Sequence, residues 1–82
     1  MATYYIQLTD KETGVSFSLI ADTLHQAKIL ATKAMKRHLW EGERMYARIY
    51  DNFLACCYSD YKQAVCSKFS IGEKWTELIT II

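Results

Sequence analysis

Two histidines and three cysteines are the residues of this chain best suited to catalysis or metal binding. His25 and His38 are thirteen positions apart on one expected helix and do not share a face. Cys56 and Cys57 are adjacent, so on a strand their side chains point to opposite faces and cannot hold one metal ion. The three glycines are isolated, and none forms a phosphate-binding loop. We therefore predict that the chain is not an enzyme, has no catalytic residues, and holds no metal or cofactor.

The same residues have ordinary structural roles. His38 is expected on the buried side of the helix, where a hydrogen-bonded structural histidine is the simpler interpretation. An odd number of cysteines argues against a disulfide framework, and free cysteine packs as a small apolar residue. We therefore expect Cys56, Cys57 and Cys66 to be reduced residues of the core.

The composition indicates one ordered domain spanning residues 1–82. About half of the residues are apolar (51%) and the formal net charge is only +1, so the chain is not expected to be disordered. The first residues lead straight into a strand-like alternation, and no apolar run is long enough to cross a membrane. We expect a cytoplasmic protein without membrane association.

Basic residues are concentrated in the middle third of the chain. Residues 25–48 hold six lysines and arginines against two glutamates. Several of these basic side chains fall on the outer face of the expected helix, with Ile29 among them. Ile29 is either a lone exposed isoleucine, which needs no explanation, or an apolar anchor within a basic contact surface.

Alternating side chains predict a β-hairpin over residues 3–20, with a polar turn at residues 10–14. Thr23, followed by Gln26 three positions later, predicts a capping box at the start of a helix over residues 24–40. One side of this helix is apolar and is expected to pack on a sheet. Its residues are Leu24, Ala27, Leu30, Ala31, Ala34, Met35, His38 and Leu39.

The second half of the chain is expected to add further strands. Residues 44–50 alternate cleanly, and Asp51-Asn52 suits a tight turn, so residues 53–59 are predicted to return as a fourth strand of a second hairpin. Residues 60–72 fit either a short helix capped by Asp60 or, slightly better, a strand over residues 64–71. Residues 75–82 predict a last strand.

These elements predict an α+β fold. Its antiparallel β-sheet has the order β-β-α-β-β, followed by one or two C-terminal strands, and is backed by one amphipathic helix.

Tyrosine and arginine alternate on the third expected strand. Arg44, Tyr46, Arg48 and Tyr50 would face away from the helix, and Tyr5 and Gln7 would join them if the strands share one sheet. This face has three open interpretations: ordinary strand residues, a protein-binding hot spot, or a platform for single-stranded nucleic acid. The near-neutral net charge counts against the last.

Several short stretches of the sequence resemble small phage-encoded anti-CRISPR proteins of the ββαββ type, which inhibit type I CRISPR-Cas effector complexes. The stretches are the helix start at residues 23–33, the strand at 46–51, and the late Gly-Glu-Lys-Trp at 72–75. The resemblance covers residues 3–59 and 72–77. Residues 60–71 look like an insertion, and Asp51-Asn52 replaces the expected hairpin glycine.

This resemblance implies a non-enzymatic inhibitor. Such proteins occupy the basic DNA-binding surface of a Cas complex, or one of its subunits, and block its target DNA. The residues that match the pattern of the family are Gln26, Lys28, Lys33 and Arg48.

The sequence as a whole predicts a phage-type protein that covers a surface of a defence complex in the host cytoplasm. The alternatives are a small nucleic-acid-binding protein that uses the Arg/Tyr face, or a homodimeric module paired through its C-terminal strand, Leu78 to Ile82. The expected contact residues are Gln26, Lys28, Ile29, Lys33, Lys36 and Arg37 on the helix, with Tyr46, Arg48 and Tyr50 on the sheet.

Overall fold

The hairpin predicted from the first alternating segments opens the fold. In a computed structural model, which describes residues 3–37, 45–68 and 74–77, β1 (Tyr4–Asp10) pairs antiparallel with β2 (Ser16–Ala21). Asp10 accepts the Glu12 backbone N–H at 2.8 Å, and Gly14 has a positive φ of 75°, a conformation that glycine adopts without strain. The turn is therefore the polar, glycine-containing turn that the sequence predicts.

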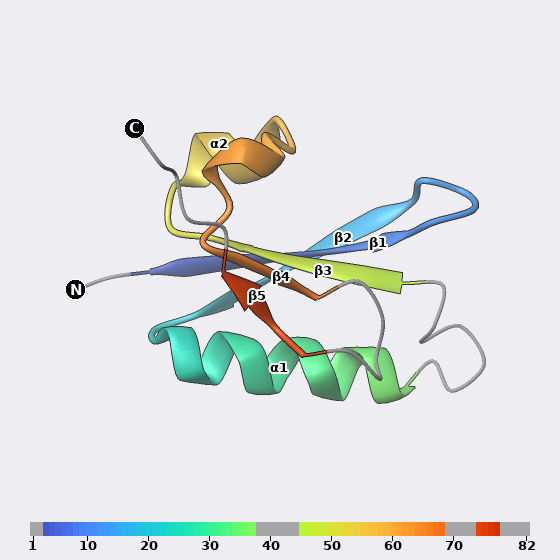
Figure 1. Cartoon of the computed structure of the whole chain (residues 1–82), viewed down its shortest axis with the longest axis horizontal. Coiled ribbons are helices and arrows are strands. Elements are labelled where there is room, and N and C mark those ends of the chain that lie inside the picture. Colours follow the sequence, from blue (N-terminus) through green and yellow to red (C-terminus); the bar gives the residue numbers. More distant parts are fainter. Residues whose placement is uncertain (1–2, 38–44, 69–73, 78–82) are drawn as a thin grey trace.

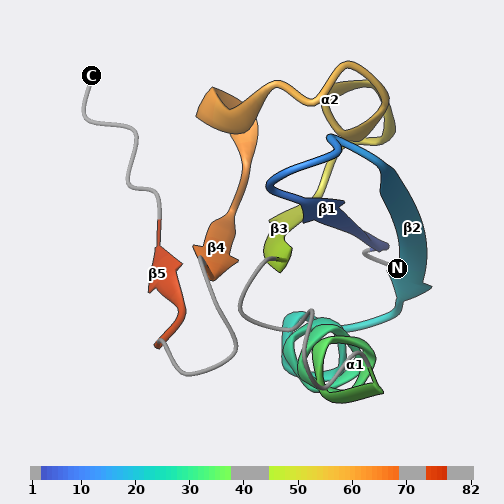
Figure 2. The same cartoon turned by 90° about the vertical axis from the view of Figure 1, so that its right-hand side faces the viewer.

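The five strands of the described residues form one antiparallel sheet in the order β2-β1-β3-β4-β5. β3 (Met45–Tyr50) lies beside β1, and β4 (Cys66–Lys68) and β5 (Thr76–Glu77) follow outward. Figure 1 shows the helix α1 (Leu24–Arg37) along one side of this sheet. Figure 2 shows the shorter helix α2 (Phe53–Cys57) on the opposite side. The sheet therefore lies between two helices of unequal length.

The helix α1 begins and packs as the sequence predicts. Thr23 caps it, because its Oγ1 accepts the Gln26 backbone N–H at 3.1 Å. Ala27, Ala31 and Met35 are fully buried. They pack in one core cluster with strand residues that include Ile6, Leu8, Ala47 and Ile49. The predicted continuation of the helix to residue 40, with His38 and Leu39, lies outside the described residues.

The predicted fourth strand and second hairpin are wrong, because residues 53–57 form α2. Asn52 acts as a helix cap: its Oδ1 accepts the Ala55 backbone N–H at 3.1 Å. Asparagine suits tight turns and helix caps equally well, so the packing of the following residues decides between them. Ala55 and Cys56 are buried against the sheet, and this contact favours the helix.

The helical conformation also changes the expected roles of the two adjacent cysteines. Cys56 is buried in the second core cluster, whereas Cys57 is exposed. The prediction that all three cysteines belong to the core therefore holds for Cys56 and Cys66 and is wrong for Cys57.

Both interpretations of residues 60–72 are partly right. Asp60 caps one 3-10 turn, η1 (Tyr61–Gln63), and accepts the Lys62 backbone N–H at 3.3 Å. The chain then forms the short strand β4. The start of the predicted last strand is seen in β5, whereas the apolar tail proposed for dimerisation, like Arg44, lies outside the described residues.

The predicted class is confirmed: the chain has an α+β fold with an antiparallel sheet and one main helix. The element order differs from the prediction in the second half, where α2 and η1 replace a strand. Across the described ranges, none of the helices has both the length and the apolar character needed to cross a membrane.

The cap of α2 gives a direct test of this correction. We expect Asn52→Ala to lower the free energy of unfolding by about 1 kcal/mol, because the Ala55 N–H loses its acceptor. Asn52→Asp keeps an acceptor and should stay close to the unchanged protein. Urea unfolding of the three proteins measures the difference, and equal stability of Asn52→Ala would contradict the helix cap.

Candidate binding site

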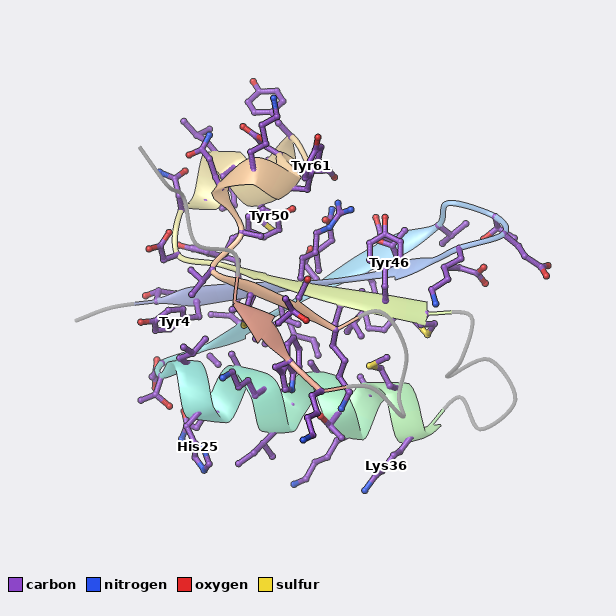
Figure 3. The ribbon with its side chains drawn as sticks, in the orientation of Figure 1. Tyr4, His25, Lys36, Tyr46, Tyr50 and Tyr61 are labelled. Atoms are coloured by element: carbon purple, nitrogen blue, oxygen red, sulfur yellow. The ribbon has the colours of Figure 1, made fainter. Side chains whose placement is uncertain are left out.

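The outward side of α1 is uniformly basic in charge. The helix carries Lys28, Lys33, Lys36 and Arg37 and no acidic residue. Lys33 and Lys36 are exposed and Lys28 is half-buried. The side chain of Arg37, the last residue of α1, lies outside the described part of the structure. Figure 3 shows His25 and Lys36 projecting from the two ends of α1, away from the sheet.

A groove of about 410 Å³ runs along this side of α1. The described residues that line it combine basic, polar and apolar side chains, and none of them is acidic; we call it the basic groove. They are His25, Lys28, Ile29, Thr32, Lys33, Lys36 and Trp75. Trp75 directly precedes β5 and lines the groove together with residues of α1.

Ile29 and Trp75 are the large apolar residues of the groove. Ile29 is 41% exposed, and Trp75 is half-buried and packs partly against the core. Thr32 adds no free hydroxyl donor to the groove, because its hydroxyl already donates to the Lys28 carbonyl at 2.9 Å. The groove therefore offers apolar contact between positively charged side chains.

A further lysine, Lys68, lies beside the groove, where it contacts Trp75. Lys68 on β4 is only 8% exposed, and its Nζ lies 5.7 Å from the centre of the Trp75 ring. A buried aliphatic stem with its ammonium group near an indole ring is a favourable cation–π arrangement. Lys68 thus contacts the ring and adds to the positive charge around it.

Most of the helix residues predicted as contacts come together in this groove. Lys28, Ile29, Lys33 and Lys36 line it, whereas Gln26 is exposed but does not. The sequence interpretation did not place Trp75 or Thr32 in the site. The Trp75 contact joins segments far apart in the chain, and no local pattern reveals such a contact.

The sheet residues predicted as contacts form a separate tyrosine–arginine cluster of Tyr46, Arg48 and Tyr61. The Arg48 Cζ lies 4.7 Å from the centre of the Tyr46 ring and 5.6 Å from that of Tyr61. Figure 3 shows both tyrosines on the side of the sheet opposite α1. The half-buried guanidinium is therefore already engaged by two rings within the fold.

Tyr50 lies on the predicted face but is fully buried, so its prediction as a contact residue is corrected. It packs with Ala55, Cys56 and Ala64, because α2 folds over this end of the sheet. Tyr5 and Gln7 do share the face, opposite Tyr50 and Arg48 respectively.

Gln7 also differs from an open contact residue. It is 7% exposed, and its Nε2 donates to Ser59 Oγ at 2.7 Å. Much of the expected open platform is therefore interior.

Burial also shapes the ionisation of two groups near α2. Desolvation raises the pKa of the Tyr50 phenol above its ordinary 10.0, and the neighbouring Arg48 guanidinium partly offsets this. Burial likewise raises the pKa of the Cys56 thiol, with a smaller opposing effect of a hydrogen bond with Ser18. Both side chains are therefore in their neutral forms at neutral pH.

No protein family model matches the sequence, and neither a curated protein nor a solved structure matches it. Within residues 3–37, 45–68 and 74–77, no three His, Cys, Asp or Glu side chains gather as metal ligands would. The functional argument therefore rests on the basic groove and the tyrosine–arginine cluster.

Removing the Tyr50 hydroxyl tests the buried environment. The Arg48 side chain lies near this hydroxyl and partly offsets the effect of burial on its pKa, but neither the hydroxyl nor Gln7 Oε1 makes a hydrogen bond of acceptable geometry among the described residues. We therefore expect Tyr50→Phe to raise the free energy of unfolding by about 1 kcal/mol at neutral pH, since an unpaired buried polar group is lost.

The gain should increase above pH 10. The pKa of Tyr50 is higher in the folded state than in the unfolded state, so the unfolded protein ionises first as the pH rises above 10.0. The free energy of unfolding of the unchanged protein therefore falls above this pH, whereas Tyr50→Phe has no such loss. Urea unfolding at neutral and alkaline pH measures both effects. A clear loss of stability in Tyr50→Phe at neutral pH would mean that the hydroxyl is bonded in the fold.

Proposed function

We propose that this chain is a non-enzymatic binding protein that contacts its partner through the basic groove. The observation that carries the proposal is the composition of the groove lining: among the described residues, three lysines line it together with two large apolar residues, and none of these lining residues is acidic. Such a surface favours a partner of opposite charge that also has an apolar group to bury.

The two kinds of residue contribute differently to binding. Exposed lysines on the rim attract a negatively charged partner and increase the association rate and the selectivity. Ile29 and Trp75 supply apolar contact area, and tryptophan is among the residues most enriched in binding hot spots. Trp75 packs partly against the core and contacts Lys68, and such contacts reduce the ordering of its ring that binding requires.

We propose a CRISPR-Cas effector complex of type I, or one of its subunits, as the partner, with inhibition of target-DNA binding as the outcome. The support for this choice is the resemblance of residues 3–59 and 72–77 to anti-CRISPR proteins. The charge of the groove adds a condition. A basic groove would be repelled by a basic DNA-binding surface, so the contact is proposed to fall on an acidic protein surface of the complex.

The sheet side is less suited to the binding of single-stranded nucleic acid. A single-strand platform needs free aromatic faces and free cations, but Arg48 is held between two tyrosine rings and Tyr50 is buried. The tyrosine–arginine cluster therefore has a structural explanation that the basic groove lacks. We place the partner on the α1 side.

Charge reversal in the groove tests this function. A mobility-shift experiment combines a type I complex with its target DNA, with and without this protein. We expect the unchanged protein to abolish the shift of the complex and to leave free DNA unshifted. The triple variant Lys28→Glu, Lys33→Glu, Lys36→Glu should inhibit at least about tenfold less, because each attraction becomes a repulsion.

Lys62→Glu is the matched control, since Lys62 is exposed on η1 and lies outside the groove lining. Circular dichroism confirms that α1 still forms in each variant. Full inhibition by the triple variant would contradict the role of the groove. Absence of inhibition by the unchanged protein would contradict the proposed partner.

A further inference from the structure

We infer that the basic groove takes an extended acidic peptide segment in which one apolar side chain stands between two carboxylates. This inference rests on the proposed binding function and names the chemistry of the partner at the contact. It depends on the spacing of the lysines, on what lies between them, and on the state of the Trp75 ring.

The spacing of the outer lysines matches that of an extended acidic segment. Lys28 and Lys36 both line the groove and are eight positions apart on α1. At about 1.5 Å per residue, they are separated by about 12 Å along the helix axis. In an extended chain, residues four positions apart are separated by about 13 Å and point to the same side. Two carboxylates with this spacing can therefore pair with the two lysines together.

The residue midway between those carboxylates points to the same side of the peptide as they do. It would meet the part of the groove between Lys28 and Lys36, where the helix presents Ile29 and Thr32; Trp75 lines the same groove. Because the Thr32 hydroxyl is engaged by the helix backbone, an apolar side chain can enter without leaving that donor unpaired. The groove therefore selects the order acidic, any, apolar, any, acidic.

The remaining cations strengthen the same preference. Lys33 lines the groove between the two outer lysines in sequence, and Lys68 holds its ammonium group near the Trp75 ring. Acidic residues that flank the core motif would therefore also be attracted. A neutral apolar peptide would use only the Ile29 and Trp75 contacts and would bind much more weakly.

The observations favour a peptide over a single-stranded nucleic acid. Nucleic-acid platforms stack successive bases on several aromatic rings, whereas Trp75 is the one aromatic residue among the described residues that line the groove. Its ring is also already in contact with a lysine ammonium group. The aliphatic Ile29 and the engaged Thr32 suit the insertion of a side chain rather than base stacking.

Fluorescence polarisation with a designed peptide tests the inference. The probe is a fluorescein-labelled nonapeptide of serine and glycine that carries glutamate at its third and seventh positions and phenylalanine at its fifth. Three altered peptides replace both glutamates by glutamine, replace phenylalanine by serine, or place the glutamates next to the phenylalanine. We expect saturable binding of the probe at low salt and about tenfold weaker binding of each altered peptide.

Protein variants locate the site. Ile29→Ser and Lys36→Glu should each weaken binding of the probe about tenfold. The matched controls are Ile20→Ser and Lys62→Glu, because both residues are exposed and lie outside the groove lining. The controls should bind as the unchanged protein does, and circular dichroism of every variant checks that the fold is retained.

Several results would overturn the inference. These are absence of binding of the probe, equal binding of the altered peptides, or equal effects of groove and control variants. Tighter binding of a fluorescein-labelled oligothymidylate that is lost in Lys36→Glu would assign the groove to nucleic acid. A concentration-dependent dimer in sedimentation that Lys36→Glu abolishes would assign it to a second copy of the chain.

The proposed function is judged separately by the mobility-shift experiment. If inhibition of the complex depends on the groove lysines but the probe does not bind, the function stands and this motif is wrong. If the probe binds at the groove but the complex is not inhibited, the motif stands and the partner class is wrong.

Discussion

The contact between the alanine side of α1 and the sheet determines what the rest of this molecule can present to a partner. Ala27 and Ala31 are fully buried, and their small side chains let the helix pack closely against β1 and β3. Turning the helix about its axis would exchange these alanines for Lys28 or Lys33, and burying an unpaired ammonium group is costly. The rotation of α1 is therefore fixed, and its charged side faces outward.

With α1 in this rotation, its outward side forms the basic groove only because the sheet extends past the helix. The order β1-β3-β4-β5 carries the chain outward, and the residue before β5 is Trp75. Lys68 on the neighbouring strand β4 contacts the ring, which lines the groove together with residues of α1. A helix surface that would otherwise be a solvated basic face thereby gains an apolar wall. An apolar centre with a polar rim is the usual anatomy of a protein interface.

Local sequence patterns predict the first half of the fold well. The alternation in β1 and β2, the Thr23 cap and the apolar side of α1 are short-range features, and the structure confirms them. The α2 segment was predicted as a strand because Asn52 suits a turn as well as a cap. Its helical conformation depends on the packing of Ala55 and Cys56 against the face of the sheet, which is a long-range contact.

The same distinction between short-range patterns and long-range contacts applies to the candidate binding site. The lysines and Ile29 were predicted from the helical periodicity, which shows the outward side of α1 directly. The sequence predicts Trp75 as the start of the last strand but not as part of the site, since its contact with α1 joins distant segments. Tyr50 was expected on an open face and is buried, because that expectation assumed a second hairpin where α2 folds over the sheet. A wrong prediction of tertiary packing thus led to a wrong prediction of a contact residue.

The central claim is that binding takes place on the α1 side of the sheet and not on the side covered by α2. A two-dimensional NMR titration of the isotope-labelled protein with a glutamate-rich peptide tests this most directly, because it reports on both sides at once. The account predicts amide shift changes that cluster at Lys28, Ile29, Thr32 and Lys36, together with the indole N–H of Trp75. Shift changes centred on Tyr46, Arg48 and Tyr61, with α1 unperturbed, would contradict it.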